Sequence, residues 1–279
     1  MQISASMVRE LRDKTGAGMM DCKKALTESG NMENAVTFLR EKGLAAAQKK
    51  AGRVASEGLV GLVVEGNKAG MVEVNCETDF VAKNEDFKKL VQDLAKRSLR
   101  VPDLIKDTES LINDKIATIG EKIALRRVEV LEGGDLYGSY LHAGGSIGCL
   151  VELKGALPEH QDLARDLAMH VAASAPVFLN REAVDTKTLE AERHILATQT
   201  REQGKPENMI ERIVNGKIEK YYSEVCFLEQ KFVKDPDKTI QKLLQEAGVT
   251  VIRFVRFKVG EGLEKKADDF AQEVAKMVG

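Results

Sequence analysis

The feature of the sequence that most constrains the fold is an internal repeat of a hairpin, a helix and a closing strand. In the first copy, apolar runs over 59–64 and 70–75 flank a turn at Gly66–Asn67, a pattern typical of a β-hairpin. A second hairpin is predicted over 136–153, where Gly144–Gly145 supply the turn. Two such copies predict an α+β fold with a duplicated core, in which each half is an antiparallel sheet backed by helices.

A helix and a final strand complete each predicted half. Apolar side chains three or four positions apart predict one helix in each half, carried by Phe87, Leu90, Val91 and Leu94 and by Leu163, Leu167 and Val171. Closing strands are expected at 123–131 and 249–259. The segment 78–84 is therefore predicted to connect a strand of the first half to its helix, which Asn84 caps.

Three stretches outside the repeat are predicted to be helical. The first 54 residues hold three short helices, of which Ser6 caps the first and Gly43 ends the third. Apolar stripes on both sides of Gly204–Pro206 predict an antiparallel helical hairpin inserted into the second half. We therefore expect an N-terminal helical domain, a first core half, a second core half in two pieces, the inserted hairpin and a C-terminal helix: 1–54, 55–135, 136–180 with 227–262, 181–226, and 263–279.

The composition argues against several kinds of function. With a net charge of -2 and a pI near 6.2, the chain lacks the basic surplus of a dedicated nucleic-acid binder, so no direct contact with nucleic acid is expected. The ten Lys/Arg against six Asp/Glu in residues 1–54 keep RNA binding open as an alternative. No apolar run reaches the roughly 18 residues that span a bilayer. Because Met1–Ser4 resembles neither a signal peptide nor an organelle presequence, we expect a cytoplasmic protein without a membrane partner.

Residues that could carry catalysis or bind a metal are present but are not grouped. The cysteines and histidines lack metal-ligand spacing, which predicts packed, reduced cysteines and no metal site: Cys22, Cys76, Cys149 and Cys226, and His142, His160, His170 and His194. The turn at Gly16–Gly18 follows a helix and lacks the spacing of a phosphate loop. We therefore expect no cofactor and interpret the chain as non-enzymatic, with an enzyme that uses this turn as an alternative.

Two segments stand out as candidate binding surfaces. Met19 and Met20 are consecutive, so at most one of them can face a three-helix core. Either the other is merely exposed, or the pair forms a soft contact surface for a partner. In the segment 78–84, Phe80 either packs beneath the connection with Val81 or points outward as a binding anchor beside Asp79.

Two stretches of the sequence closely resemble the signatures of a known family. Residues 11–26 are similar to the N-terminal signature of the elongation factor Ts family, and residues 73–83 are similar to its second signature. The predicted order of helical domain, duplicated core, inserted hairpin and C-terminal helix also resembles that family from end to end. The resemblance implies that the N-terminal domain is similar to ubiquitin-associated (UBA-like) domains.

The resemblance implies a guanine-nucleotide exchange factor. Members of the family bind the GTPase elongation factor Tu in its GDP form and promote GDP release, which allows GTP to bind again. By resemblance, Asp79 and Phe80 insert near the nucleotide and magnesium site of the GTPase. The contact residues that the resemblance implies are Thr78, Asp79, Phe80, Val81, Arg12, Met19, Met20 and His142.

Two questions about assembly and activity stay open at this stage. Members of the family differ in how the helical insertion is used in oligomers, so a homodimer through the hairpin is neither implied nor excluded. The main alternative function is a simple interaction module that holds a partner without driving nucleotide exchange. A nucleotide-release assay separates the two, because an exchange factor turns over and a passive binder titrates.

Overall fold

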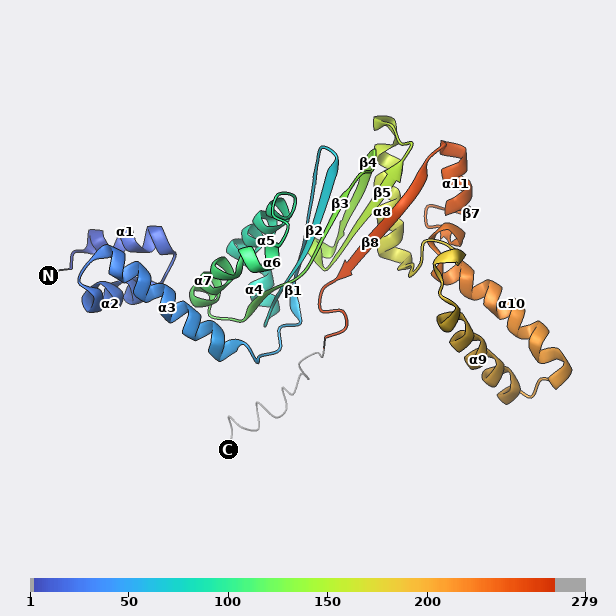
Figure 1. The fold of residues 1–279 in the computed structure, drawn as a ribbon, viewed down its shortest axis with the longest axis horizontal. Helices are drawn as coiled ribbons and strands as arrows, with labels where there is room; N and C mark the ends of the chain where they lie inside the picture. The colour runs from blue at the N-terminus through green and yellow to red at the C-terminus, as the bar shows by residue number, and fades with distance from the viewer. Residues whose placement is uncertain (1–2, 264–279) are drawn as a thin grey trace.

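The structure is a computed structural model that describes residues 3–263, so the predicted C-terminal helix, apart from Leu263, lies outside the described residues. Two antiparallel three-stranded sheets form the middle of the molecule (Figure 1). The three N-terminal helices lie at one end, and the helical hairpin Thr186–Val225 projects at the other. This mixture of helices and antiparallel sheets confirms the predicted α+β class. Within residues 3–263, no helix is long and apolar enough to cross a bilayer.

The N-terminal helices are α1 (Ala5–Thr15), α2 (Met19–Ser29) and α3 (Met32–Lys50). Ser4, and not Ser6 as predicted, caps α1, because its Oγ accepts a hydrogen bond from the amide of Met7 at 3.2 Å. The three helices enclose a small core, whose buried side chains are Val8, Leu11, Cys22, Ala25, Leu26 and Ala35.

Gly43 does not end α3, contrary to the sequence prediction. The helix continues through it to Lys50, and Gly43 lies where α3 packs against α7 (Glu109–Ile119). A Cβ at this position would come within 3.4 Å of the Cβ of Ala117 and 3.6 Å of the carbonyl oxygen of Asn113. The glycine therefore permits a close contact between two helices, which offsets its unfavourable helix propensity of about 1 kcal/mol.

The first sheet consists of β1 (Glu57–Glu65), β2 (Lys68–Cys76) and β3 (Ile123–Glu132), in that order. Between β2 and β3 the chain forms α4 (Asp79–Lys83), α5 (Glu85–Ser98), α6 (Leu104–Asp107) and α7. One face of the sheet packs on α5 around Val72, Val74, Phe87, Leu90, Val91 and Leu94. The predicted cap is confirmed, since Asn84 Oδ1 accepts a hydrogen bond from the amide of Asp86 at 2.8 Å.

The second sheet consists of β4 (Leu136–His142), β5 (Ile147–Lys154) and β8 (Thr250–Lys258), in that order. Between β5 and β8 come α8 (Gln161–Ser174), the hairpin of α9 and α10, the short strands β6 (Lys231–Phe232) and β7 (Asp235–Thr239), and α11 (Ile240–Ala247). α8 covers this sheet as α5 covers the first. The core between them includes Val151, Leu153, Ala164, Leu167, Val171 and Phe227.

The two sheets share a third apolar core. It contains Val60, Ala69, Met71, Leu131, Tyr137, Leu150 and Phe257. β5 approaches β1 so closely that a Cβ at Gly148 would lie 2.3 Å from Cγ1 of Val60. Across the seam between the sheets, Arg253 of β8 donates a hydrogen bond to the carbonyl oxygen of Val130 on β3 at 2.9 Å.

The inserted hairpin consists of α9 (Thr186–Glu202) and α10 (Glu207–Val225). Its inner face buries three side chains of α10 against α9: Ile210, Val214 and Ile218. At the base of the hairpin, the guanidinium of Arg181 donates to Glu219 at 2.8 Å and to Glu229 at 2.7 Å. These ion pairs tie the hairpin to the segment that leads back to the second sheet.

Candidate partner-binding site

The segment 78–84 contains a single helical turn where the sequence predicted a connecting loop. The turn, α4, starts directly after Thr78, whose Oγ1 accepts a hydrogen bond from the amide of Val81 at 3.4 Å. Thr78 is thus an N-cap of the kind that serine and threonine commonly form. Sequence patterning missed the turn because five residues are too few to show a helical period.

Phe80 points into solvent from this turn. Its side chain is 81% exposed, the largest exposure among the large apolar side chains of residues 3–263. The other side of the turn holds it to the molecule, because Ala82 is buried and Val81 packs against the core of the first half. Of the two arrangements that the sequence left open for Phe80, the structure has the outward one.

Two carboxylates fix the base of the turn. Glu121 accepts hydrogen bonds from the amide of Thr78 at 3.0 Å and from its Oγ1 at 2.7 Å. Glu77 accepts one from the amide of Lys122 at 2.6 Å. Since Cys76 pairs with Ile123 in the register of β2 and β3, these bonds continue the pairing of the two strands beyond the sheet. Phe80 is therefore held on a rigid base.

Asp79 is ionised and lies beside Phe80 at the surface. A hydrogen bond from Lys83 at 2.6 Å lowers the pKa of its carboxyl group below the ordinary value of 3.8. The pair lies one helical turn apart and both side chains are exposed, so it contributes little to stability. Its carboxylate is free to exchange Lys83 for a polar group of a partner at small cost.

The turn that follows His142 lies at the same end of the molecule as α4. His142 is exposed, and its Nδ1 lies 3.3 Å from Oη of Tyr140. The chain then turns through Ala143–Gly145, and a Cβ at Gly145 would lie 3.1 Å from the carbonyl oxygen of Val60 on β1. α4 also contacts β1, so the His142 turn and the Phe80 turn both lie against this strand.

The three predicted contact residues of the N-terminal helices form a separate group. Arg12 is exposed on α1, and Met19 and Met20 are 55% and 77% exposed at the start of α2. Neither methionine is in the core, which excludes the alternative in which one of them is buried. In Figure 1, α1 and α2 lie beyond α7, away from both sheets. The molecule therefore offers two separate exposed surfaces.

The buried cysteines and the buried His170 are groups of a packed core. Burial raises the pKa of the Cys76 and Cys149 thiols to about 12 and that of Cys226 to about 11, so none of these cysteines is a thiolate at neutral pH. His170 is buried between Gln230 and the amide of Val233. Within residues 3–263, no three His, Cys, Asp or Glu side chains are grouped as metal ligands.

Comparison with known protein families gives one match. The family described as Elongation factor TS matches residues 77–261, which is more than half of the chain. The matched region begins one residue before Thr78 and includes Phe80 and the His142 turn, whereas Arg12 and the two methionines precede it. The chain therefore belongs to the elongation factor Ts family, the translation factors that act as nucleotide exchange factors on elongation factor Tu.

Proposed function

We propose that this chain binds elongation factor Tu in its GDP form and accelerates GDP release by inserting the Asp79–Phe80 turn near the nucleotide and magnesium site. GTP then binds to the emptied partner. The observation that supports this proposal is the 81% exposure of Phe80 on a turn whose base is fixed by Glu121. The chain itself catalyses no covalent reaction.

A rigid, exposed phenylalanine is well suited to act as a wedge. Burying a phenylalanine side chain stabilises a complex by about 1.5–3 kcal/mol relative to leaving it exposed. Because the turn is already ordered by Thr78 and Glu121, little of that free energy is lost to ordering the chain on binding. Asp79 supports Phe80 by pairing with polar groups of the partner.

The mechanism follows from thermodynamic linkage. If the chain weakens GDP binding to its partner by some factor, GDP weakens binding of the chain by the same factor. A change of about 10⁴-fold corresponds to roughly 5.5 kcal/mol of differential interaction. A wedge that fits only the GDP-free partner supplies part of this difference, and displacement of the magnesium shell supplies the remainder.

The remaining implied contacts form the outer parts of the same interface. We assign Arg12, Met19 and Met20 to a first contact, which the N-terminal helices make with the partner. These helices form a domain that ends at residue 54. His142 is assigned to a contact beside that of Phe80. Thr78 and Val81, the neighbours of the Asp79–Phe80 pair in the chain, are assigned to the edge of the same contact. The helical hairpin and the C-terminal segment provide further partner surfaces. The N-terminal helices form the UBA-like domain in this scheme.

The test is the release of a fluorescent GDP from elongation factor Tu, followed by stopped flow with a substoichiometric amount of the chain. The wild-type chain should release many equivalents of GDP, because an exchange factor turns over. Phe80→Ala should slow release about tenfold or more, since the loss of a buried aromatic anchor costs about 1.4 kcal/mol or more. Leu157→Ala is the matched control, because Leu157 is also an exposed apolar residue (54%) but lies beyond the other end of β5.

The alternatives give different results in the same assay. A passive interaction module would release at most one equivalent of GDP per chain, whatever the variant. An unchanged release rate with Phe80→Ala would contradict the assignment of the wedge. An enzyme that uses the Gly16–Gly18 turn would bind ATP or GTP on its own, which equilibrium dialysis of the isolated chain detects.

A further inference from the structure

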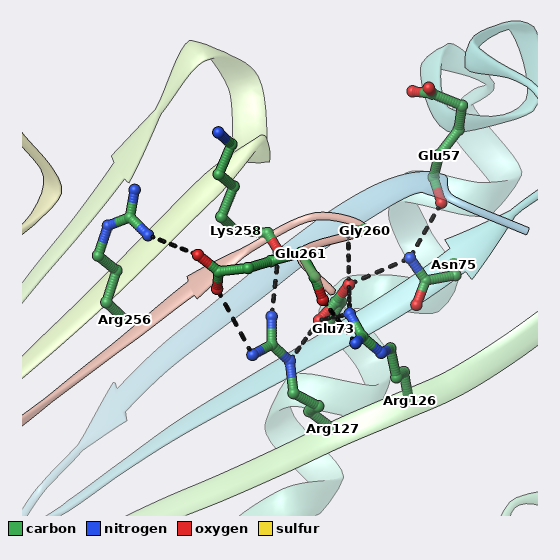
Figure 2. A network of polar contacts seen from close by, with 9 residues as sticks. All are labelled: Glu57, Glu73, Asn75, Arg126, Arg127, Arg256, Lys258, Gly260 and Glu261. Atoms are coloured by element: carbon green, nitrogen blue, oxygen red, sulfur yellow. Dashed lines mark hydrogen bonds and ion pairs between the residues drawn. The ribbon is translucent and has the colours of Figure 1, made fainter. Parts of the chain in front are cut away.

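A fully buried carboxylate lies at the point where the two sheets meet. The side chain of Glu73, in the middle of β2, is 0% exposed. Figure 2 shows the donors that surround it: Arg126 at 3.1 Å, Arg127 at 2.5 Å, the side-chain amide of Asn75 at 3.1 Å and the main-chain amide of Gly260 at 2.9 Å. An ionised carboxylate can be buried in this way only when such donors replace its hydration.

The network joins parts of the chain that are far apart in sequence. Gly260 follows β8 and is 187 residues from Glu73. Arg126 donates to the carbonyl oxygen of Glu261 at 2.6 Å, and Arg127 donates to that of Lys258 at 3.0 Å. Both arginines come from β3, so Arg127 binds Glu73 and the last residue of β8 at once, while Arg126 binds Glu73 and the chain just after β8 (Figure 2). The second sheet and the start of the C-terminal segment are thereby tied to the first sheet.

The backbone after β8 fits this contact closely. Gly260 has a left-handed conformation with φ at 69°, and a Cβ there would lie 2.3 Å from the carbonyl oxygen of Ser56. Only glycine allows the chain to bring its amide to Glu73 at this point without displacing the residue before β1. The contact between residues 56, 73 and 260 therefore defines one arrangement of the two halves.

A second buried glutamate occupies the corresponding place in the other sheet. Glu152 on β5 pairs with Arg253 on β8 at 3.2 Å, just as Glu73 pairs with Arg127 on β3. In both sheets the register shifts immediately after the glutamate. Arg253 also reaches Glu129 across the seam. This second cluster is a natural control, because it joins the same two sheets but not the chain after β8.

The two clusters differ in what lies near them. Glu73 is three residues before Cys76, where β2 leads into Thr78 and the Phe80 turn. Glu152 is two residues before the end of β5 at Lys154, and the His142 turn precedes the other end of that strand. Glu73 therefore lies closer in the chain to the Phe80 turn than Glu152 does, and within the described residues it alone of the two contacts the chain after β8.

We propose that Glu73 is a positioning residue for nucleotide exchange: it holds the Phe80 turn, the second sheet and the start of the C-terminal segment in one geometry, so that all reach the partner together. This inference rests on the proposed function and concerns the arrangement of the interface, not the wedge itself. Glu73 acts through the segments that it joins and does not touch the partner.

The test compares Glu73→Gln with Glu152→Gln in GDP release from elongation factor Tu over a range of chain concentrations. Glu73→Gln should lower the maximal release rate at saturating chain by about tenfold, since small misplacements of interacting groups have large effects on rate. Glu152→Gln should leave the maximal rate unchanged. A merely structural role reduces the fraction of folded chain, which raises the half-saturating concentration and leaves the maximal rate unchanged.

Amide hydrogen exchange provides a measurement that does not depend on the partner. In Glu73→Gln, peptides that contain Gly260 should exchange faster than in the wild type, while those of α5 keep their protection. If Glu73→Gln does not fold, Arg126→Gln replaces it, because Arg126 is partly exposed and Arg127 remains paired with Glu73. Arg126→Gln should likewise lower the maximal rate.

The outcomes are distinct. A wild-type chain that fails to accelerate GDP release would contradict the proposed function, whatever the variants do. A wild-type chain that accelerates release, together with a Glu73→Gln variant of unchanged maximal rate, would overturn the positioning role alone. An equal loss of maximal rate in Glu152→Gln would also overturn it, because the effect would then come from general loosening of the seam.

Discussion

Apart from the inserted hairpin and the strands β6 and β7, the two halves of the core differ in the segment that follows the middle strand of each sheet. In the first half, two residues separate β2 from the turn that exposes Phe80. In the second half, β5 is followed by Gly155, the buried Ala156, the exposed Leu157 and the turn Pro158–His160 before the chain enters α8. The strands, their order and their covering helices are otherwise alike.

This difference shows how one scaffold supplies both stability and function. The faces of the sheets are committed to packing, so they cannot change without loss of the core. The connections at the strand ends carry few packed side chains and can diverge, which is where binding residues usually lie. The Phe80 turn is such a connection, whereas the corresponding connection of the second half carries the less exposed Leu157 and no phenylalanine, tyrosine or tryptophan.

The largest expected effect tests whether the two halves are packed to the same tolerance. Gly61 on β1 and Gly138 on β4 occupy the same position in the two hairpins, and each lies against the covering helix. A Cβ at Gly138 would lie 1.9 Å from the carbonyl oxygen of Ala164, and one at Gly61 would lie 2.9 Å from that of Val91. Gly138→Ala should therefore destabilise the chain by about 3 kcal/mol or more and Gly61→Ala by about 1–3 kcal/mol.

Urea unfolding followed by circular dichroism measures both effects. Gly216→Ala in α10 is the control, because no atom lies within 4 Å of the Cβ that it would add. This substitution should stabilise the chain by about 0.5–1 kcal/mol, since alanine favours the helix. Equal effects at Gly61 and Gly138 would show that the second half can relax away from α8, contrary to the packing described above.

Acid should weaken the second half before the first. Burial lowers the pKa of His170 on α8 below its ordinary value of 6.5, although the hydrogen bond to Gln230 opposes this shift. As the pH falls below 6.5, the unfolded chain therefore binds a proton that the folded chain does not, and stability falls. For a single proton the slope is at most about 1.4 kcal/mol per pH unit.

Glu73 in the first half responds at lower pH. Burial alone would raise the pKa of its carboxyl group, but the amide of Gly260, Arg127 and Asn75 together bring it below 4.5. Its contribution to stability is complete above pH 4.5 and is lost as the pH falls toward the folded pKa.

Urea unfolding at several pH values tests the role of His170. In the His170→Gln variant, the free energy of unfolding should depend less steeply on pH near pH 6 than in the wild type. If the free energy of unfolding has the same pH dependence in both chains, His170 does not cause the loss of stability in acid.

The smallest expected effect concerns the base of the Phe80 turn. Glu121→Gln keeps one oxygen for Thr78 but loses the second acceptor and the charge. Stability should fall by about 1 kcal/mol or less, and GDP release should slow by less than with Phe80→Ala. Glu132→Gln at the other end of β3 is the control, since Glu132 pairs only with the exposed Lys68 among the described residues. If GDP release with Glu121→Gln is as slow as with Phe80→Ala, then the rigidity of the turn matters more than the aromatic contact that Phe80 makes.

Much of the fold followed from local sequence patterns. The alternating apolar runs predicted both hairpins, and Asn84 marked the start of α5 correctly. Gly43 misled the prediction because a glycine can end a helix or admit a neighbouring one, and only the position of α7 decides between these roles. Ser4 and Ser6 are equivalent as caps until the first turn is built.

The candidate site was less accessible to sequence reasoning. Whether Phe80 points outward depends on the cap at Thr78 and on Glu121, which lies 43 residues further along the chain. The antiparallel pairing of the strands 70–75 and 123–131 could have indicated the contact between Thr78 and Glu121, because it places these two residues just beyond adjacent strand ends. The network around Glu73 spans 187 residues and depends on a left-handed Gly260, so no local pattern indicates it.

The central claim is that Phe80 on its fixed turn couples binding of the chain to loss of GDP from the partner. The most direct measurement is the dissociation constant of the chain from elongation factor Tu with and without saturating GDP, for the wild type and for Phe80→Ala. The ratio of the two constants gives the coupling free energy. We expect a large ratio for the wild type and a much smaller one for Phe80→Ala. If Phe80→Ala raises both dissociation constants by the same factor, so that their ratio is unchanged, then Phe80 only adds affinity. That result would contradict its role as a wedge.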